Sequence, residues 1–389
     1  MEISEQRLRS NYFALVQAAA SDAGTTSVLA VVKAGAYGHG VTLCAQVLAA
    51  AGAPWLGVTD AEEGVAVRRS LDHTVKSHDP QPRILVMCGP LPGDAGLIAK
   101  SRLTPVVWTA EQLSSLANGV DSKDPPQIHL EIDTGMSRQG VLPGATLDRF
   151  LDHLLGFPKF HLQGVLTHFV SAEVAGASIT QQQRKRFEAA LAQIARRGFT
   201  PEWIHAGSSS TIDEASSLSW LREMATCYGA HSLVRSGLAL YGYTLPIEGG
   251  QGMLSPKLMP VLTWKSRIVN LCEVPAGATI GYNATFTAQQ TTRLALLPVG
   301  YADGLRRELS ATNSKPGGWT IIRGRRAPIV GRISMNLTTV DVTGIADVAL
   351  EDEVTLLGEG ITADAHARIA HTSPYEILCG LRSPPQLTT

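Results

Sequence analysis

The residues best suited to chemistry begin with a lysine at the end of an apolar run. Val28 to Val32 leads directly into Lys33 in the stretch VLAVVKAGAYGHG. The run is typical of a buried strand of a parallel sheet, and the glycines after it favour a tight turn before a helix that begins at about Val41. A lysine at such a strand mouth is a candidate for Schiff-base chemistry, although a lysine that reaches out to solvent fits this stretch equally well.

Further polar side chains follow other apolar runs of the first 240 residues. They are Glu131, Asp133 and Arg138 in HLEIDTGMSRQG, His168 in GVLTHF, Ser208, Ser209 and Ser210 in HAGSSST, and Arg235 in LVRSGLALYG. Taken singly, each has an ordinary structural explanation, such as a surface cation for Arg138 or a satisfied core histidine for His168. Their common place at the ends of apolar runs is what calls for a functional explanation.

The apolar runs recur eight times and alternate with helical patterns. The runs are 28–32, 55–58, 84–87, 105–108, 128–132, 164–166, 203–205 and 233–234. The clearest helical pattern is 181–198, with a glycine stop, and shorter ones cover 111–116 and 145–155. Eight such units in about 240 residues predict an α/β fold that begins with a (β/α)8 barrel of the TIM type.

A barrel of this type gathers its active-site groups at the carboxyl ends of its strands. Because the polar residues above all follow strands, we expect them to meet on one face. The phosphate position of such barrels lies after the seventh and eighth strands. There the sequence offers Ser208, Ser209 and the backbone of Gly237 and Leu238.

The last 140 residues follow a different pattern, with short apolar strands separated by turns. This spacing predicts a mainly antiparallel β domain. Residues 246–260, rich in glycine and proline, are interpreted as the linker, which gives domains at 1–245 and 246–389. Tyr282, Tyr301 and Tyr375 are expected in turns, where a hydroxyl is free to act, although packing over a turn explains each one as well.

Composition narrows the class of protein. The chain has 389 residues, 44% of them hydrophobic and 17% charged, and a net charge of -1. There is no basic excess for binding nucleic acid, no apolar run long enough to span a membrane, and no signal-peptide pattern at the N-terminus. The five cysteines are scattered, which fits free thiols in a reducing cytoplasm, and no sequence motif supports a metal site.

Nine motifs together resemble the alanine racemase family. VLAVVKAGAYGHG resembles its pyridoxal-phosphate attachment motif, and DTGMSRQG, THF, the histidine–serine stretch, VRSGLALYG, IGYNATF, PVGYADG, GRISMN and SPYEILCG follow in the family's order. The match extends from about Glu2 to Tyr375. One such motif would be weak, but nine in order over two domains of the expected kinds are specific.

The resemblance implies pyridoxal 5'-phosphate as the cofactor, attached to Lys33. Arg235 would face the pyridine nitrogen, and Arg138 would lie near the phenolic oxygen. An arginine stays protonated, so it would leave that nitrogen neutral and favour simple reprotonation over transamination or decarboxylation. The phosphate would be held by Tyr37, Ser209, Tyr375 and the backbone of Gly237 and Leu238.

The resemblance also implies a two-base racemisation of L-alanine and D-alanine. Lys33 would be one base, and Tyr282 from the partner of a homodimer would be the other, because inversion needs proton delivery from the opposite face. His168 would link Arg235 to the Tyr282 hydroxyl. The amino-acid substrate would be met by Arg138 and the partner's Met335 backbone, with Tyr301 and Arg307 at the opening of the site. The product would supply D-alanine for peptidoglycan.

Four positions depart from the family pattern. Gly35 stands where asparagine or aspartate is usual, Ser208 replaces an asparagine, and Asn336 replaces an acidic residue beside Met335. Glu131 stands where many relatives have a lysine that becomes carbamylated and presents a negative charge to Arg138. Here a carboxylate is built in, on a shorter arm, although a strand-end carboxylate facing solvent is the simpler interpretation.

Other functions remain open at this point. One is a racemase of the same family with wider specificity, for serine or larger amino acids. A second is a barrel decarboxylase of basic amino acids with the same two-domain plan, which would need a triple-glycine phosphate loop and a cysteine-centred acid that the sequence lacks. A third is a non-catalytic pyridoxal-phosphate carrier, which would consist of the barrel alone.

Overall fold

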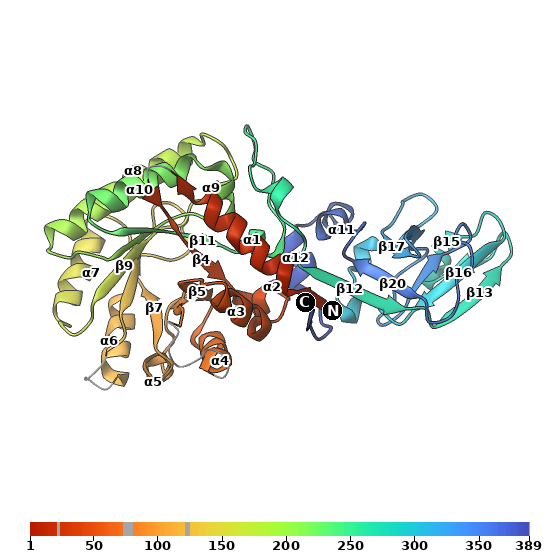
Figure 1. Cartoon of the computed structure of the whole chain (residues 1–389), viewed down its shortest axis with the longest axis horizontal. Coiled ribbons are helices and arrows are strands. Elements are labelled where there is room, and N and C mark those ends of the chain that lie inside the picture. Colours follow the sequence, from red (N-terminus) through yellow and green to blue (C-terminus); the bar gives the residue numbers. More distant parts are fainter. Residues whose placement is uncertain (22–23, 73–80, 121–124, 389) are drawn as a thin grey trace. The chain divides into compact units, whose positions relative to one another are not determined.

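The computed structural model describes residues 1–21, 24–72, 81–120 and 125–388. They form two compact units (Figure 1). The barrel unit contains Gln6–Ala36 and Val41–Met259, and the C-terminal unit contains Met1–Glu5, Tyr37–Gly40 and Pro260–Thr389.

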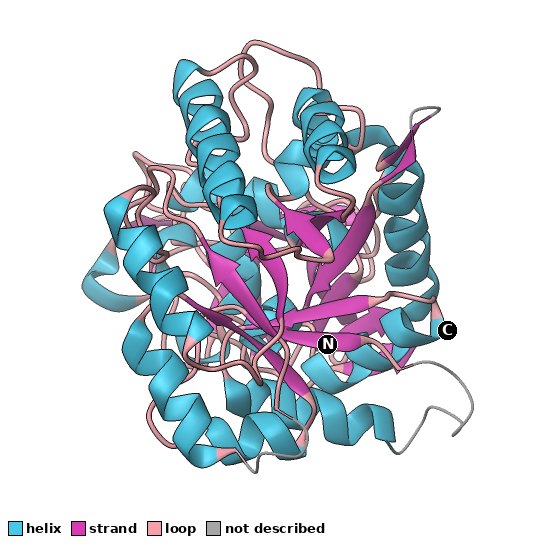
Figure 2. Cartoon of the chain, turned by 90° about the vertical axis from the view of Figure 1, so that its left-hand side faces the viewer, coloured by secondary structure: helices cyan, strands magenta, loops and turns pink. Residues whose placement is uncertain are grey.

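The barrel unit is a closed barrel of eight parallel strands with helices around it (Figure 2). The predicted (β/α)8 fold and all eight predicted strands are confirmed. The strands are β4 (Ser27–Val31), β5 (Trp55–Val58), β6 (Arg83–Val86), β7 (Leu103–Val107), β8 (Ile128–Glu131), β9 (Leu162–Leu166), β10 (Trp203–His205) and β11 (His231–Ser236). The ring closes where β11 pairs in parallel with β4.

The helices of this unit begin with α1 and alternate with the strands. They are α1 (Glu5–Ala18), α2 (Lys33–Tyr37), α3 (Val41–Ala50), α4 (Ala61–Asp72), α5 (Ala95–Lys100), α6 (Ala110–Gly119), α7 (Ala145–Leu155), α8 (Ser178–Arg196), α9 (Ser209–Glu214) and α10 (Ser216–Cys227). The helix predicted to begin at about Val41 is α3. Helix α8 buries Phe187 and Ile194, as its 3.6-residue period requires. A small hairpin, β2 (Ala20–Ser21) and β3 (Gly24–Thr25), and the 3-10 helix η1 (Leu238–Tyr241) complete the unit.

The C-terminal unit is mainly antiparallel, as predicted. Its six-stranded sheet has the order β18 (Arg325–Pro328), β17 (Trp319–Ile322), β20 (Glu353–Leu357), β12 (Leu262–Arg267), β1 (Glu2–Ser4) and β21 (Gln386–Thr388), of which only the β1–β21 pair is parallel among the described residues. A second sheet has the order β13 (Asn270–Val274), β16 (Thr292–Leu297) and β19 (Thr338–Asp341). The unit also has a two-stranded ribbon, β14 (Thr279–Ile280) with β15 (Phe286–Thr287), and the helices α11 (Ala363–Ala370) and α12 (Pro374–Cys379). Its 3-10 helices are η3 (Tyr282–Ala284), η4 (Tyr301–Asp303) and η5 (Arg307–Leu309).

The segment interpreted as a linker is bound to the barrel. The buried carboxylate of Asp213 accepts a 2.7 Å hydrogen bond from the N–H of Leu254, and the N–H of Met253 donates to its carbonyl at 3.4 Å. Glu248 pairs with Val174 in an isolated bridge. The barrel unit therefore continues to Met259. The domain boundary predicted at residue 245 precedes this segment and stays a prediction.

Candidate active site

The barrel unit carries its predicted polar residues at the carboxyl ends of its strands. Lys33 comes two residues after β4, Glu131 is the last residue of β8, His168 comes two residues after β9, Ser209 begins α9 after β10, and Arg235 lies near the end of β11. In a parallel barrel these ends share one face. The structure therefore brings these side chains to the face where barrel enzymes do their chemistry.

Lys33 opens a short turn of left-handed backbone. Ala34, Gly35, Ala36 and Tyr37 have φ values of 53°, 63°, 57° and 54°. Left-handed backbone costs a residue with a side chain roughly 1–2 kcal/mol, so Ala34, Ala36 and Tyr37 need support from their surroundings. The N–H of Ala36 donates to the carbonyl of Val32 at 2.8 Å, and the N–H of Ala34 donates to the Glu63 carboxylate at 2.7 Å. These bonds fix the backbone that carries the lysine.

Arg235 is a buried cation held by neutral groups. Its Nη2 donates to the carbonyl of Thr167 at 2.8 Å and to Nδ1 of His168 at 3.2 Å, and its Nη1 donates to Nδ1 of His205 at 3.2 Å. Burial lowers the pKa of its guanidinium to about 10, with Glu131 acting in the opposite direction. Arg235 therefore stays protonated at neutral pH, and within the described residues none of these partners is a carboxylate.

His168 is held in its neutral form beside this cation. Burial, and then the charges of Arg235, Arg138 and Lys33, lower the pKa of its imidazole to about 3. Because an arginine can only donate, Nδ1 of His168 accepts and the ring hydrogen is on Nε2. The free Nε2–H of this ring can act as a donor to an oxygen at the same face.

Backbone and hydroxyl donors converge after β10 and β11. The N–H groups of Gly237 and Ala239 point to Oγ of Ser209 at 3.2 and 3.4 Å, and Ser236 Oγ lies 3.1 Å from the same atom. Backbone N–H groups and hydroxyls gathered at one place are donors of the kind that hold a phosphate. The position is the phosphate position of barrel enzymes, so these residues fit a phosphorylated cofactor.

Glu131 is buried and does not face solvent, so the simpler interpretation of this residue is wrong. Its Oε2 accepts a 2.5 Å hydrogen bond from Gln139, whose Nε2 also donates to the carbonyl of Met87 at 2.9 Å. Burial raises the pKa of Glu131, while Gln139 and then the charges of Arg235 and Arg138 lower it. Arg138 is exposed, and within the described residues the hydrogen-bonded partner of Glu131 is Gln139.

In the C-terminal unit, Tyr37 lies beside Tyr375. Their ring centroids are 5.9 Å apart, and a side chain at Gly38 would come within 2.2 Å of the carbonyl oxygen of Leu378 in α12. Burial raises the pKa of Tyr37, and Tyr375 and Cys379 act in the same direction. The expectation that Tyr375 stands in a turn is wrong, because Tyr375 lies in the first turn of α12, which begins at Pro374.

Three other predicted residues are exposed on loops of this unit. Tyr282, in a 3-10 turn, is 66% exposed, Met335 is 57% exposed and Tyr301 is 44% exposed. The N–H of Tyr301 donates to the carbonyl of Ser334 at 3.1 Å, so the loops of Tyr301 and Met335 are joined. The side chains of Tyr282, Met335 and Tyr301 are therefore open to solvent in this chain.

Gly281 and Asn336 explain how these loops are built. A Cβ at Gly281 would lie 3.0 Å from the backbone nitrogen of Arg332, and Gly281 has a φ of 76°, so the turn that presents Tyr282 needs glycine. The amide of Asn336 donates to Asp303 Oδ2 at 3.4 Å. An acidic group is thus still present beside Met335, although Asn336 itself is neutral.

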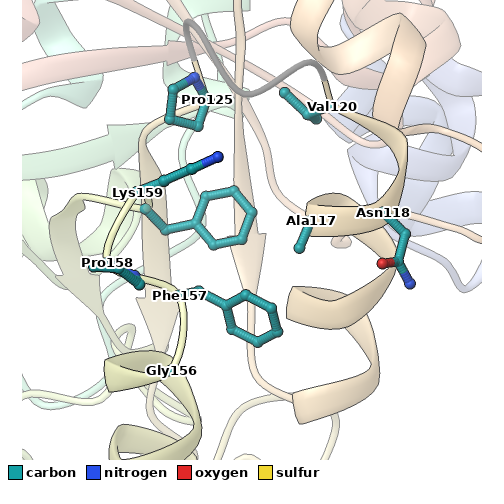
Figure 3. A pocket seen from close by; sticks show the side chains of 9 residues that line it. Ala117, Asn118, Val120, Pro125, Gly156, Phe157, Pro158 and Lys159 are labelled. Carbon is teal, nitrogen blue, oxygen red and sulfur yellow. The ribbon is translucent and has the colours of Figure 1, made fainter.

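A separate apolar pocket lies elsewhere on the barrel unit (Figure 3). It has a volume of about 330 Å³ and is lined by the end of α6 and the loop after α7, with Phe157 and Phe160 facing it. Both segments lead into the amino ends of strands. Because chemistry in barrels is done at the carboxyl ends, this pocket is not the active site.

The described residues contain neither a metal-type cluster nor a membrane-spanning helix. Among residues 1–21, 24–72, 81–120 and 125–388, no group of three or more histidine, cysteine or acidic side chains could hold a metal ion. In the same part of the chain, no helix is long and apolar enough to cross a membrane.

Several residues around the site were not predicted from the sequence. They are Glu63, His129, Gln139, His205 and Ala239. Glu63 has the pattern of an ordinary helix-start acid, and His129 and His205 lie within strand patterns. Only the alternation along β8, which places His129 on the same face as Glu131, offered a signal.

The fold and the site together are typical of one class of enzyme. A closed parallel barrel presents a lysine, a buried arginine and donors of the phosphate-holding kind on its carboxyl face, and an antiparallel β unit follows it. This combination is typical of barrel enzymes that bind a phosphorylated cofactor through lysine.

This chain is similar to known proteins in both sequence and structure. Models of the alanine racemase N-terminal and C-terminal domains match residues 3–245 and 261–387. Alanine racemase of Syntrophobacter fumaroxidans is 35% identical over 390 residues, covering 98% of this chain and 94% of the relative. The structure of alanine racemase from Streptomyces coelicolor A3(2) has a TM-score of 0.84 at 30% identity, covering 99% of this chain and 96% of that one. Bartonella henselae alanine racemase, with covalently bound pyridoxal phosphate, has a TM-score of 0.80 at 26% identity, covering 100% and 98%.

The chain belongs to the alanine racemase family. It is an amino-acid racemase, of a family that uses pyridoxal phosphate. The resemblance drawn from the nine motifs is therefore confirmed, and the presence of both family domains sets aside the barrel-only carrier.

Proposed function

We propose that this chain interconverts L-alanine and D-alanine with pyridoxal 5'-phosphate attached to Lys33. The observation that carries the proposal is Arg235, a buried cation whose hydrogen-bond partners are neutral. A guanidinium with neutral partners can donate a hydrogen bond to a nearby acceptor, such as a pyridine nitrogen, and it keeps its proton when it does so.

The remaining cofactor contacts are proposed from the same motifs. Arg138 would lie near the phenolic oxygen, and His168 would complete the surroundings of Arg235. The donors gathered at Ser209 support the phosphate site. The full phosphate set that we propose is Tyr37, Ser209, Tyr375 and the backbone of Gly237 and Leu238. When bound, the conjugated cofactor accepts the electron pair released as the α-proton leaves.

Two bases on opposite faces would invert the substrate centre. Lys33 Nζ would hold or take the α-proton on one face, and the hydroxyl of Tyr282 would do so on the other. The high exposure of Tyr282 in its own chain supports a role in the site of a second copy, in a homodimer. The exposed backbone at Met335 would meet the substrate carboxylate of the same neighbour, with Arg138 on the other side and Tyr301 at the opening.

His168 would link Arg235 to that tyrosine through hydrogen bonds at its two ring nitrogens. Its Nδ1 accepts from Arg235, so its Nε2–H is left to donate to the Tyr282 hydroxyl oxygen of a second copy. To act as a base, a tyrosine must be in its phenolate form. A hydrogen-bond donor at the phenol oxygen stabilises that form. The neutral state of His168 is essential to this role, because a protonated ring would repel Arg235.

The setting of the reaction is also proposed. We place it in the cytoplasm, with D-alanine supplied to peptidoglycan synthesis. The scattered cysteines support a reducing compartment, since Cys44 is buried and none of the described cysteines is in a disulfide.

The test is a chiral assay of purified protein with L- and D-alanine, serine and lysine. Alanine is expected to be racemised fastest, and Lys33→Ala is expected to abolish both turnover and the borohydride-reducible link to the cofactor. Lys159→Ala, at an exposed loop position away from the carboxyl face, is the control. Faster racemisation of serine or lysine would show the wider specificity instead, and a retained reducible link in Lys33→Ala would remove the assignment of Lys33.

A further inference from the structure

Polar side chains continue from Arg235 into the interior of the barrel. Nδ1 of His205 accepts from Arg235 at 3.2 Å, and Nε2 of His205 lies 2.9 Å from Nδ1 of His129. Both histidines are fully buried. They come from β10 and β8, which are the two neighbours of β9 in the barrel. Two histidines in contact with a cation inside a barrel need a defined arrangement of hydrogens.

The arginine determines that arrangement. A guanidinium has donors and no acceptor, so Nδ1 of His205 must accept and its hydrogen must be on Nε2. That hydrogen then points to Nδ1 of His129, which must accept in turn. His129 therefore carries its hydrogen on Nε2. Burial lowers the pKa of His129 to about 3 and that of His205 well below its usual value, so both rings stay neutral.

Two polar atoms at the far end of this series are left without a partner among the described residues. Nε2 of His129 and Oε1 of Gln163 in β9 are both buried, and neither has a hydrogen-bond partner within the described residues. Nε2 of Gln163 donates to Glu202 at 3.2 Å. The hydrogen-bonded series thus ends at His129, and each donor in it points away from Arg235.

The residues packed around the His129 ring restrict its position. Gly164 is the cross-strand neighbour of His129, and a Cβ at Gly164 would come within 2.5 Å of the ring. On another side, Trp55 meets the ring edge to face, with centroids 5.1 Å apart. The ring is therefore fixed in orientation by packing as well as by its hydrogen bonds.

We propose that His129 is a positioning residue for Arg235, which it holds through a one-way chain of hydrogen bonds from Arg235 to His205 to His129. The proposal rests on the proposed function, because it is the placement of Arg235 toward the cofactor that the chain controls. If the chain were reversed, His205 would present an N–H to the guanidinium, and Arg235 would have to move. The chain thus ties the orientation of Arg235 to the single tautomer of each ring.

The first measurement is solid-state NMR of the full-length protein with isotopically labelled histidine, in which ring nitrogen shifts report the tautomer. The expected result is a neutral ring with its hydrogen on Nε2 for both His129 and His205, assigned by their loss in single variants. A hydrogen on Nδ1 of either ring, or a protonated ring at pH 7, would overturn the proposal. This readout needs no turnover, so it stands even if the wild-type protein fails to racemise alanine.

The second measurement compares variants of the far end. His129→Gln can still accept from His205, so it should keep the His205 signal and the affinity for pyridoxal phosphate. His129→Leu should give His205 a mixture of tautomers, shift the absorption of the bound cofactor, and weaken its binding about tenfold, as expected for one buried hydrogen bond. If His129→Leu does not fold, the ring tautomers of the wild-type protein and of His129→Gln carry the test.

His366→Leu is the matched control, because His366 is another buried histidine but lies in α11 of the C-terminal unit. It should destabilise the protein without changing the His205 signal or the cofactor spectrum. If His129→Leu behaves like His366→Leu in both readouts, His129 is a packing group and the proposal fails.

Discussion

The backbone N–H of Ala34 donates a 2.7 Å hydrogen bond to the carboxylate of Glu63, which lies in the first turn of α4. The same carboxylate accepts from the N–H of Thr59 at 2.8 Å. One side chain thus joins the loop after β4 to the loop after β5. Ala34 directly follows Lys33, so Glu63 restrains the left-handed backbone on which the lysine depends.

Glu63→Ala is expected to loosen this turn and lower racemase activity about tenfold to a hundredfold, since a hydrogen bond to a charged group contributes roughly 1.5–3 kcal/mol. Glu63→Gln keeps one acceptor oxygen and should fall between the two. Steady-state kinetics and the fraction of Lys33 trapped by borohydride in the presence of pyridoxal phosphate measure the effect. Glu62→Ala, the exposed neighbour, is the control, and equal behaviour of the two alanine variants would remove the role of Glu63.

Gly35 explains one departure from the family pattern. Its φ of 63° and ψ of 35° are left-handed, and asparagine and aspartate are the side chains that best tolerate this region. The backbone therefore gives no sign that glycine makes this turn looser. Space is available at this position, because no atom lies within 4 Å of an added Cβ.

Gly35→Asn should thus leave the free energy of unfolding nearly unchanged, whereas Gly35→Val should lower it by about 1–2 kcal/mol through backbone strain. Urea unfolding of the two variants measures the difference. Equal stabilities would mean that the turn is not left-handed in solution.

Much of the fold could be predicted because barrel strands are buried on both faces and appear as unbroken apolar runs. Strand β13 was missed since its residues, Asn270–Val274, are all at least partly exposed and do not differ from a loop in composition. Strand β1 was missed for another reason. Glu2–Ser4 is too short to stand out, and its partners β12 and β21 are hundreds of residues away in the sequence.

The candidate site could be predicted where a polar residue interrupts an apolar pattern at a strand end, as Lys33 and Arg235 do. His129 and His205 lie within strands, and which face of a strand lines the barrel depends on closure and register. Glu63 acts through a backbone N–H of a distant loop, which no local pattern reports. The sequence therefore identifies the reacting side chains better than the residues that position them.

Glu131 allows a test of the charge beside the site. Its carboxylate is built in, so wild-type activity should not respond to bicarbonate. Glu131→Gln keeps the shape and the bond from Gln139 but removes the charge that favours the protonated form of Arg235. We expect a tenfold to hundredfold loss in activity or cofactor affinity.

Kinetics in degassed and bicarbonate-supplemented buffer, with Glu223→Gln on the surface of α10 as the control, decide this point. A bicarbonate response of the wild type would mean that another group carries a carbamate. An unchanged Glu131→Gln would show that the charge has no role.

The buried histidines predict how stability depends on pH. His129 and His205 have pKa values below the ordinary 6.5 in the folded protein. The stability that they contribute is fully present above pH 6.5 and declines as the pH falls, because the unfolded chain then binds protons that the folded chain excludes. From pH 6.5 to 5 the decline should be roughly 2 kcal/mol for each histidine.

Urea unfolding at pH 7 and pH 5 measures this decline. His129→Gln removes one of four histidines whose pKa is lowered on folding, the others being His168, His205 and His366, and should lessen the decline by about a quarter. His231→Gln, at an exposed position, should leave it unchanged. An identical pH dependence in the wild type and His129→Gln would contradict the neutral, buried state of His129.

Subunit complementation tests the shared, two-base site most directly. Lys33→Ala and Tyr282→Phe are each expected to be nearly inactive, and mixing them gives a hybrid dimer in which one site has both Lys33 and the partner's Tyr282. Random reassortment makes half of the dimers hybrids with one intact site of two, so racemisation of L-alanine should recover to about one quarter of the wild-type rate. If mass spectrometry confirms subunit exchange and no activity returns, Lys33 and Tyr282 do not serve one site from two chains.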